Sequence, residues 1–127
     1  MGGGFAILRP EELNMRAAAR FYGSVPKQSG RSGICPVVGS FGERDAVFAP
    51  HGKRLRRHLE TLDVPHDVKL YPGAGHSFMS EHEPGLTTSI GKHGPMKVAY
   101  DAEAAEDAWD RMLSFFDEHL GAAAQPR

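Results

Sequence analysis

The sequence predicts an α/β domain with about three mostly parallel strands and flanking helices. Residues 34–41 form a short apolar run with β-branched side chains, which is typical of a strand buried on both faces of a parallel sheet. Residues 47–62 follow with an amphipathic helical pattern, and residues 66–71 then alternate polar and apolar as a strand does. Strands separated by helical crossovers imply a largely parallel sheet with helices packed on it.

The first part of the chain adds one further strand. Residues 17–23 fit either a short helix or a strand, and the ending Phe21-Tyr22-Gly23 before Pro26 favours a strand that runs into a loop. Residues 26–33 are polar and rich in glycine and serine, which predicts a surface connection. The three glycines at positions 2–4 suit a segment that packs too closely against its neighbours for side chains to fit.

The last part of the chain contains a loop and a long helix. Residues 77–98 show no clean period and predict a long loop with room for a helical turn. Residues 100–120 predict a helix with Asp101 as its N-cap and with Trp109, Phe115 and Phe116 in the core. Gly121 is expected to end this helix, so that residues 1–121 form the domain and residues 122–127 a disordered tail.

Composition and charge argue against several classes of protein. The formal net charge of -1, with no clustered basic face, gives no reason to expect nucleic acid. No apolar run approaches the roughly 18 residues of a membrane span, and the N-terminal residues do not resemble a secretory signal. Cys35 is the single cysteine, which excludes an internal disulfide and favours a reducing cytoplasm. Its apolar neighbours predict a small buried side chain rather than a reactive thiol.

Two residues that could take part in catalysis each follow one of the predicted strands. Asp45 follows the strand predicted over residues 34–41, and His76 follows the strand predicted over residues 66–71. The loops past the carboxyl ends of strands are where ligands bind in open α/β sheets. An aspartate and a histidine one crossover apart can meet there, and the carboxylate would then fix the tautomer of the imidazole.

The two segments resemble those of a known family. Residues 40–45 (Ser-Phe-Gly-Glu-Arg-Asp) and residues 70–78 (Leu-Tyr-Pro-Gly-Ala-Gly-His-Ser-Phe) are similar to the acid and histidine segments of the dienelactone hydrolases. The resemblance extends from Phe21-Tyr22-Gly23 to the helix that contains Trp109. It implies the C-terminal portion of an α/β-hydrolase fold, with a nucleophile that comes before the aspartate and the histidine in the chain.

The resemblance also implies that the nucleophile lies just before Met1. Met1-Gly2-Gly3 is similar to the residues that follow the nucleophile in the family's strand-to-helix turn, and Met1 would supply one backbone N–H of the oxyanion hole. Cys35, after Gly33-Ile34, is the nearest alternative turn, but Val37 stands where the closing glycine is required. The chain is therefore expected to be truncated just after its nucleophile and inactive by itself.

Each candidate residue also has a plainer interpretation. Asp45 could be only a turn or cap residue before the next helix, and His76 only an exposed loop histidine. Phe78 and Met79 could line a substrate pocket or simply anchor the loop that follows His76. The histidines and acids of this loop could also be interpreted as a metal site, but their spacing matches no standard metal-ligand pattern, so no metal is expected; these residues are His76, His82, His93, Glu81 and Glu83.

The family resemblance implies hydrolysis of a small carboxylic ester or lactone through an acyl-enzyme, without a metal or organic cofactor. His76 would act as general base and then acid, and Asp45 would orient it. The alternative is a non-catalytic half-hydrolase: a gene remnant, or a subunit that needs a partner. Such a subunit would self-associate or bind a missing N-terminal half through the exposed edge of its sheet.

Overall fold

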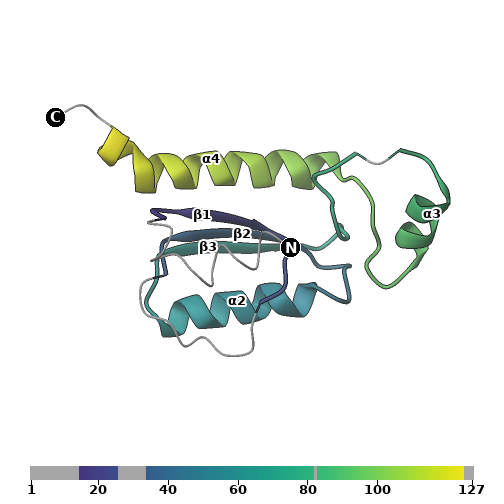
Figure 1. The fold of residues 1–127 in the computed structure, drawn as a ribbon, viewed down its shortest axis with the longest axis horizontal. Coiled ribbons are helices and arrows are strands. Elements are labelled where there is room, and N and C mark those ends of the chain that lie inside the picture. The colour runs from purple at the N-terminus through teal and green to yellow at the C-terminus, as the bar shows by residue number, and fades with distance from the viewer. Residues whose placement is uncertain (1–14, 26–33, 82, 125–127) are drawn as a thin grey trace.

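A computed structural model describes residues 15–25, 34–81 and 83–124 of the 127-residue chain. These residues form a sheet of three parallel strands in the order β1-β2-β3, where β1 is Ala18–Phe21, β2 is Val37–Gly42 and β3 is His66–Tyr71. Helix α2 (Ala49–Thr61) covers one face of the sheet and helix α4 (Ala102–Ala124) the other (Figure 1). The predicted α/β class and the mostly parallel sheet are confirmed.

The two faces of the sheet follow from the alternation of side chains along each strand. Val37 and Phe41 of β2 point toward α2, where they pack with Leu55 and Leu59 in one core cluster. Gly52 of α2 lies against the ring of Phe41, so the helix approaches the strand closely at this point. On the opposite face, Tyr71 of β3 packs with the buried alanines and aromatic residues of a second cluster: Ala74, Phe78, Ala104 and Ala108.

Several predicted boundaries are confirmed and others are shifted. The strand His66–Tyr71 has its predicted bounds, and residues 17–23 contain a strand rather than a helix. The strand predicted over residues 34–41 begins three residues later, and the helix predicted over residues 47–62 is one or two residues shorter at each end. The segment predicted as a long loop contains a complete short helix, α3 (Leu86–His93).

Helix α4 differs from its prediction in two ways. It continues to Ala124, so Gly121 does not end it and the first residues assigned to the tail are helical. Its core is narrower than predicted: Phe115 is buried, Phe116 is half-buried, and Trp109 is 53% exposed. The prediction that Trp109 lies in the core was wrong, because α4 packs against Tyr71 of the sheet through Ala104 and Ala108.

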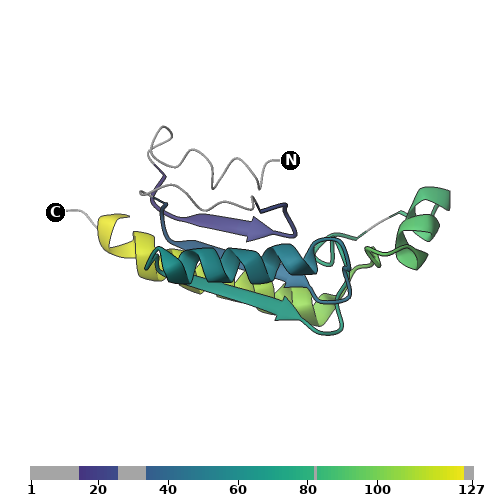
Figure 2. The same cartoon turned by 90° about the horizontal axis from the view of Figure 1, so that it is seen from below.

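Helix α3 lies away from the body formed by the sheet and its two covering helices, on a long excursion between β3 and α4 (Figures 1 and 2). None of its residues is buried, and Leu86 and Ile90 are among its most exposed side chains. None of the helices in the described parts of the chain is both long enough and apolar enough to cross a membrane. Two predicted features, the oxyanion residue Met1 and the end of the tail after Ala124, lie outside the described residues.

Candidate active site

Asp45 and His76 lie together at the carboxyl edge of the sheet. Asp45 is in the turn between β2 and α2, and His76 is in the loop that follows β3. Their side chains are in direct contact: Nδ1 of His76 lies 2.7 Å from Oδ2 of Asp45. Because a carboxylate only accepts hydrogen bonds, the short contact requires the proton on Nδ1 and leaves the lone pair of a neutral imidazole on Nε2.

The carboxylate of Asp45 is fixed by the turn in which it lies. Its side chain is fully buried, and its second oxygen, Oδ1, accepts hydrogen bonds from the backbone N–H groups of Val47 and Phe48, each at 3.0 Å. The two oxygens of this carboxylate therefore have different partners. One oxygen holds the turn that begins α2, and the other holds the histidine.

Two aromatic rings enclose the imidazole of His76. The ring centroid of Tyr22, at the end of β1, lies 5.1 Å from that of His76, and the ring of Phe48 lies 4.9 Å from it. The His76 side chain retains 20% of its exposure, so its outer edge stays open to solvent. This arrangement holds the ring on its faces and leaves one edge accessible, as a residue that exchanges protons with a substrate requires.

Sequence reasoning did not identify Tyr22 or Phe48 as residues of the site. Tyr22 directly follows β1 at the same edge as Asp45 and His76, and this position was the one signal that could have identified it. Tyr22 has a φ of 36°, an uncommon backbone conformation for a residue other than glycine, and Ser77 beside His76 has a φ of 55°. Unusual backbone conformations of this kind gather where a structure fixes functional side chains.

The two residues suggested for a substrate pocket are in different surroundings. Phe78 is fully buried against Tyr71 and Ala108, so it anchors the loop that follows His76. Met79 is half-buried and lines a hollow of about 380 Å³ that it shares with α4 residues, among them Trp109 and Glu106. Cys35 is buried as predicted, and burial raises the pKa of its thiol, which makes it a poor nucleophile.

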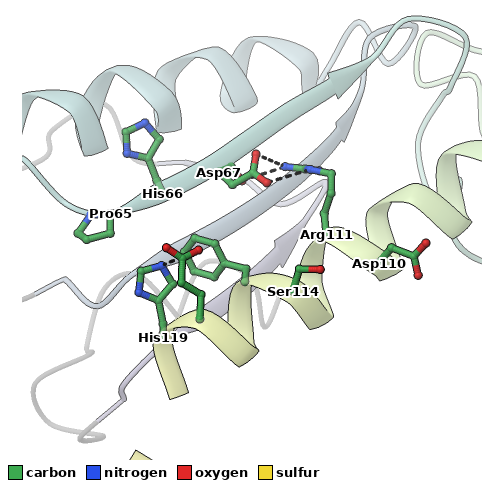
Figure 3. A pocket seen from close by; sticks show the side chains of 9 residues that line it. Pro65, His66, Asp67, Asp110, Arg111, Ser114 and His119 are labelled. Atoms are coloured by element: carbon green, nitrogen blue, oxygen red, sulfur yellow. Dashed lines mark hydrogen bonds and ion pairs between the residues drawn. The ribbon is translucent and has the colours of Figure 1, made fainter. Parts of the chain in front are cut away.

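A larger pocket of about 470 Å³ lies at the opposite, amino-terminal edge of the sheet (Figure 3). The first residues of β3 and the second half of α4 line it. Arg111 lines this pocket, but its guanidinium donates hydrogen bonds to other residues of the chain, namely Asp67, Ser40 and Tyr71. The described residues contain no group of three or more His, Cys, Asp or Glu side chains that could hold a metal ion.

Known proteins resemble this chain over most of its length. Residues 1–120 match the dienelactone hydrolase family. The chain is 33% identical over 92 residues to a protein of Yersinia pestis named "putative carboxymethylenebutenolidase", a match that covers 72% of this chain and 29% of that protein. It is 24% identical over 137 residues to a protein of Bradyrhizobium sp named "probable 2-oxo-3-(5-oxofuran-2-ylidene)propanoate lactonase", with 94% of this chain and 48% of that protein covered. The chain thus spans less than half the length of these two relatives.

Solved structures share the fold. A "putative dienelactone hydrolase" from Klebsiella pneumoniae superposes with a TM-score of 0.54 at 23% identity, over 80% of this chain and 41% of that one. A second structure, named m3DLH, superposes with a TM-score of 0.61 at 22% identity, over 84% of this chain and 46% of that one. The three parallel strands and their helices are therefore part of an α/β-hydrolase fold. With the match over residues 1–120, the chain belongs to the dienelactone hydrolase family.

Proposed function

We propose that this chain supplies the acid and the histidine of a catalytic triad that hydrolyses carboxylic esters or lactones. The observation that carries the proposal is the 2.7 Å contact between Nδ1 of His76 and Oδ2 of the buried Asp45, at the edge of the sheet where this class of fold holds its chemistry. The family membership supports hydrolysis as the reaction, and the names of the relatives indicate lactones as one substrate class.

The nucleophile, by this proposal, is a cysteine or serine that directly precedes Met1 in a longer hydrolase chain. The backbone N–H of Met1 would then be one of the two donors that stabilise the oxyanion. The short coverage of the relatives supports this proposal, because more than half of each relative's length lies outside the match.

The reducing cytoplasm expected from the single cysteine stays a prediction.

In the proposed mechanism, Nε2 of His76 takes the proton of the nucleophile while the nucleophile bonds to the carbonyl carbon. That proton passes to the alkoxide oxygen when the C–O bond of the ester or lactone breaks, which leaves an acyl-enzyme. Water then attacks the acyl group with His76 again as base, and the nucleophile recovers its proton. Asp45 stays ionised throughout and stabilises the imidazolium. No step uses a metal or an organic cofactor.

The wall of the substrate site is a separate part of the proposal. Met79, in the loop after His76, is half-buried and lines the hollow it shares with Trp109. We assign Met79 to the wall of the substrate pocket, and we assign to Phe78 the role of anchoring the loop. The small-molecule substrate is therefore expected to lie beside this loop.

A second candidate function is a non-catalytic half-hydrolase that binds a partner or a second copy. Two observations favour it. Strand β1 has a neighbouring strand on one side only among the described residues, so it presents a sheet edge that another strand could extend. The Arg20 side chain on this strand is also buried, with no hydrogen-bond partner in the part of the chain that the structure describes.

The experiment that tests the triad uses the chain joined to whatever coding sequence precedes it in frame. Hydrolysis of small aryl esters and of dienelactones is measured for the wild type, for His76→Ala and for Asp45→Asn. We expect His76→Ala to abolish turnover. Asp45→Asn should lower kcat by about 10⁴-fold, because the amide favours the wrong tautomer. His93→Ala, which changes an exposed histidine of α3, is the matched control and should leave turnover unchanged.

Retained hydrolysis in His76→Ala would refute the triad, and a loss below about tenfold in Asp45→Asn would reduce Asp45 to a structural role. The intact mass of the protein from its own source separates the two candidate functions. A mass well above 13.8 kDa supports the longer hydrolase, whereas a mass equal to it supports the half-hydrolase.

A further inference from the structure

The excursion between His76 and α4 returns to the body through three residues that contact both catalytic loops. We call Pro95, Met96 and Lys97 the strap. The backbone N–H of Ala46, next to Asp45, donates to the carbonyl of Pro95 at 2.9 Å. The backbone N–H of His76 donates to the carbonyl of Met96 at 2.8 Å. Consecutive carbonyls of the strap thus hold the acid loop and the histidine loop in one arrangement.

The strap lies so close to the histidine loop that no side chain fits between them. A Cβ on Gly75 would collide with the carbonyl of Lys97, and a Cβ on Gly42 would collide with the carbonyls of Ala74 and Gly75. The backbones of the strap, the histidine loop and the end of β2 are therefore stacked directly on one another. Glycine is required at these two positions because only a residue without a side chain permits the approach.

The conformation of the strap is itself specified. Lys97 has a φ of 50°, in the left-handed region that residues other than glycine rarely adopt. Its N–H donates to the carbonyl of Gly94, and the N–H of Val98 donates to the carbonyl of Gly91 at the end of α3. The short helix and the turn after it therefore set the direction in which the two strap carbonyls point.

We propose that the strap is a positioning element of the catalytic pair. Met96 acts through its carbonyl on the backbone of His76, Pro95 acts on the backbone beside Asp45, and Lys97 fixes the turn that aims both carbonyls. The strap thereby holds Nδ1 of His76 against Oδ2 of Asp45. This inference rests on the proposed function, since it assigns a purpose to the contact that the triad requires.

The test compares two substitutions at one position, Lys97→Pro and Lys97→Gly. Both remove the lysine side chain. Proline forces φ to about −65° and removes the N–H, whereas glycine accepts the positive φ without strain. The measurement is the ¹⁵N NMR spectrum of the His76 imidazole in the complete chain, under alkaline conditions that leave imidazoles neutral, because it shows which ring nitrogen carries the proton.

We expect Lys97→Gly to keep the Nδ1–H form of His76. Lys97→Pro should shift the spectrum toward a mixture of both tautomers, with far-UV circular dichroism unchanged. A folded Lys97→Pro variant whose His76 spectrum equals that of the wild type would overturn the proposal. If Lys97→Pro does not fold, Gly75→Ala and its control Gly73→Ala replace it. A Cβ at position 73 meets open space, with its nearest atom, Oδ2 of Asp101, 3.9 Å away.

The same criterion applies to this second pair: a change in Gly75→Ala alone supports the positioning role, and identical spectra in both variants refute it. The readout needs neither nucleophile nor substrate. A failure of the strap proposal is therefore distinguishable from a failure of the proposed hydrolysis, which would show as absent turnover with an intact His76–Asp45 contact.

Discussion

Two arginines lie on opposite faces of the sheet, and their surroundings differ completely. Arg111 on α4 binds both carboxylate oxygens of Asp67, the hydroxyls of Ser40 and Tyr71, and backbone carbonyls of Gly39 and Asp67. Arg20 on β1 is 1% exposed and has no hydrogen-bond partner among the described residues. Both side chains are removed from water, but only one is compensated.

The pKa values of the two guanidinium groups are shifted in opposite directions. Burial lowers the pKa of Arg20 to about 10, and no group among the described residues offsets this cost to the charged form. Burial also opposes the charge of Arg111, but its hydrogen bonds to Asp67 and Tyr71 outweigh this and raise its pKa. On the α4 face the buried arginine is therefore paired, whereas on the α2 face next to β1 the buried charge of Arg20 is uncompensated within the described part of the chain.

The largest change in stability is expected on the α4 face, for the substitution of Arg111. Arg111→Met should lower the free energy of unfolding by about 2–3 kcal/mol, because it leaves Ser40 and Tyr71 without their shared donor and Asp67 without its ion pair. Urea denaturation followed by circular dichroism measures it. Arg57→Met, an exposed arginine of α2, is the control and should change stability by less than about 0.5 kcal/mol. A loss as small in Arg111→Met as in the control would remove the distinction between the two arginines.

On the α2 face, the substitution of the buried arginine is expected to raise stability and not to lower it. Arg20→Met should raise the free energy of unfolding of this chain by about 1 kcal/mol or more, because an apolar side chain of similar length avoids burying an uncompensated charge. The same denaturation experiment and the same control apply. A clear destabilisation by Arg20→Met would mean that Arg20 has a partner outside the described residues, and the comparison would then fail.

The smallest change is expected in how stability depends on pH, for the substitution of Asp107 on α4. Hydrogen bonds from Lys69 and then Tyr71 lower the pKa of Asp107. A carboxyl whose folded-state pKa lies below its unfolded value contributes stability above the unfolded value and loses it as pH falls through the folded one. Asp107→Asn should therefore flatten the acid limb of a plot of stability against pH, by a small amount since the pair is half-exposed. An unchanged acid limb would show that these contacts contribute nothing to stability.

The strands and the contact between Asp45 and His76 could be predicted from the sequence because their signals are local. The bounds of His66–Tyr71 follow from its alternation, and Asp45 and His76 lie in the turns that follow two of the predicted strands. The burial of Arg20 could not be predicted, since a strand of four residues does not indicate what covers each face. The strap contacts could not be predicted either, because bonds between backbone groups do not depend on particular side chains, and the glycines at positions 42 and 75 do not indicate which segment lies against them.

Trp109 shows a different limit. The apolar spacing of α4 is genuine, but the buried residues Ala104, Ala108 and Phe115 lie along a narrow stripe of the helix, and Trp109 lies beside this stripe and is exposed. A hydrophobic periodicity predicts which side of a helix faces inward, but not how wide its buried stripe is. Trp109 therefore belongs to a correctly predicted helix and has an incorrectly predicted environment.

Strand order equals chain order in this sheet, so each strand pairs with the one synthesised just before it. As the chain leaves the ribosome, Asp45 and His76 emerge 31 residues apart and can meet as soon as β3 and the strap have paired. Asp67 and Tyr71, by contrast, must wait for Arg111, which emerges 40 residues after Tyr71. The contact between Asp45 and His76 is thus available earlier in synthesis than the contacts of Arg111 on the other side of the chain.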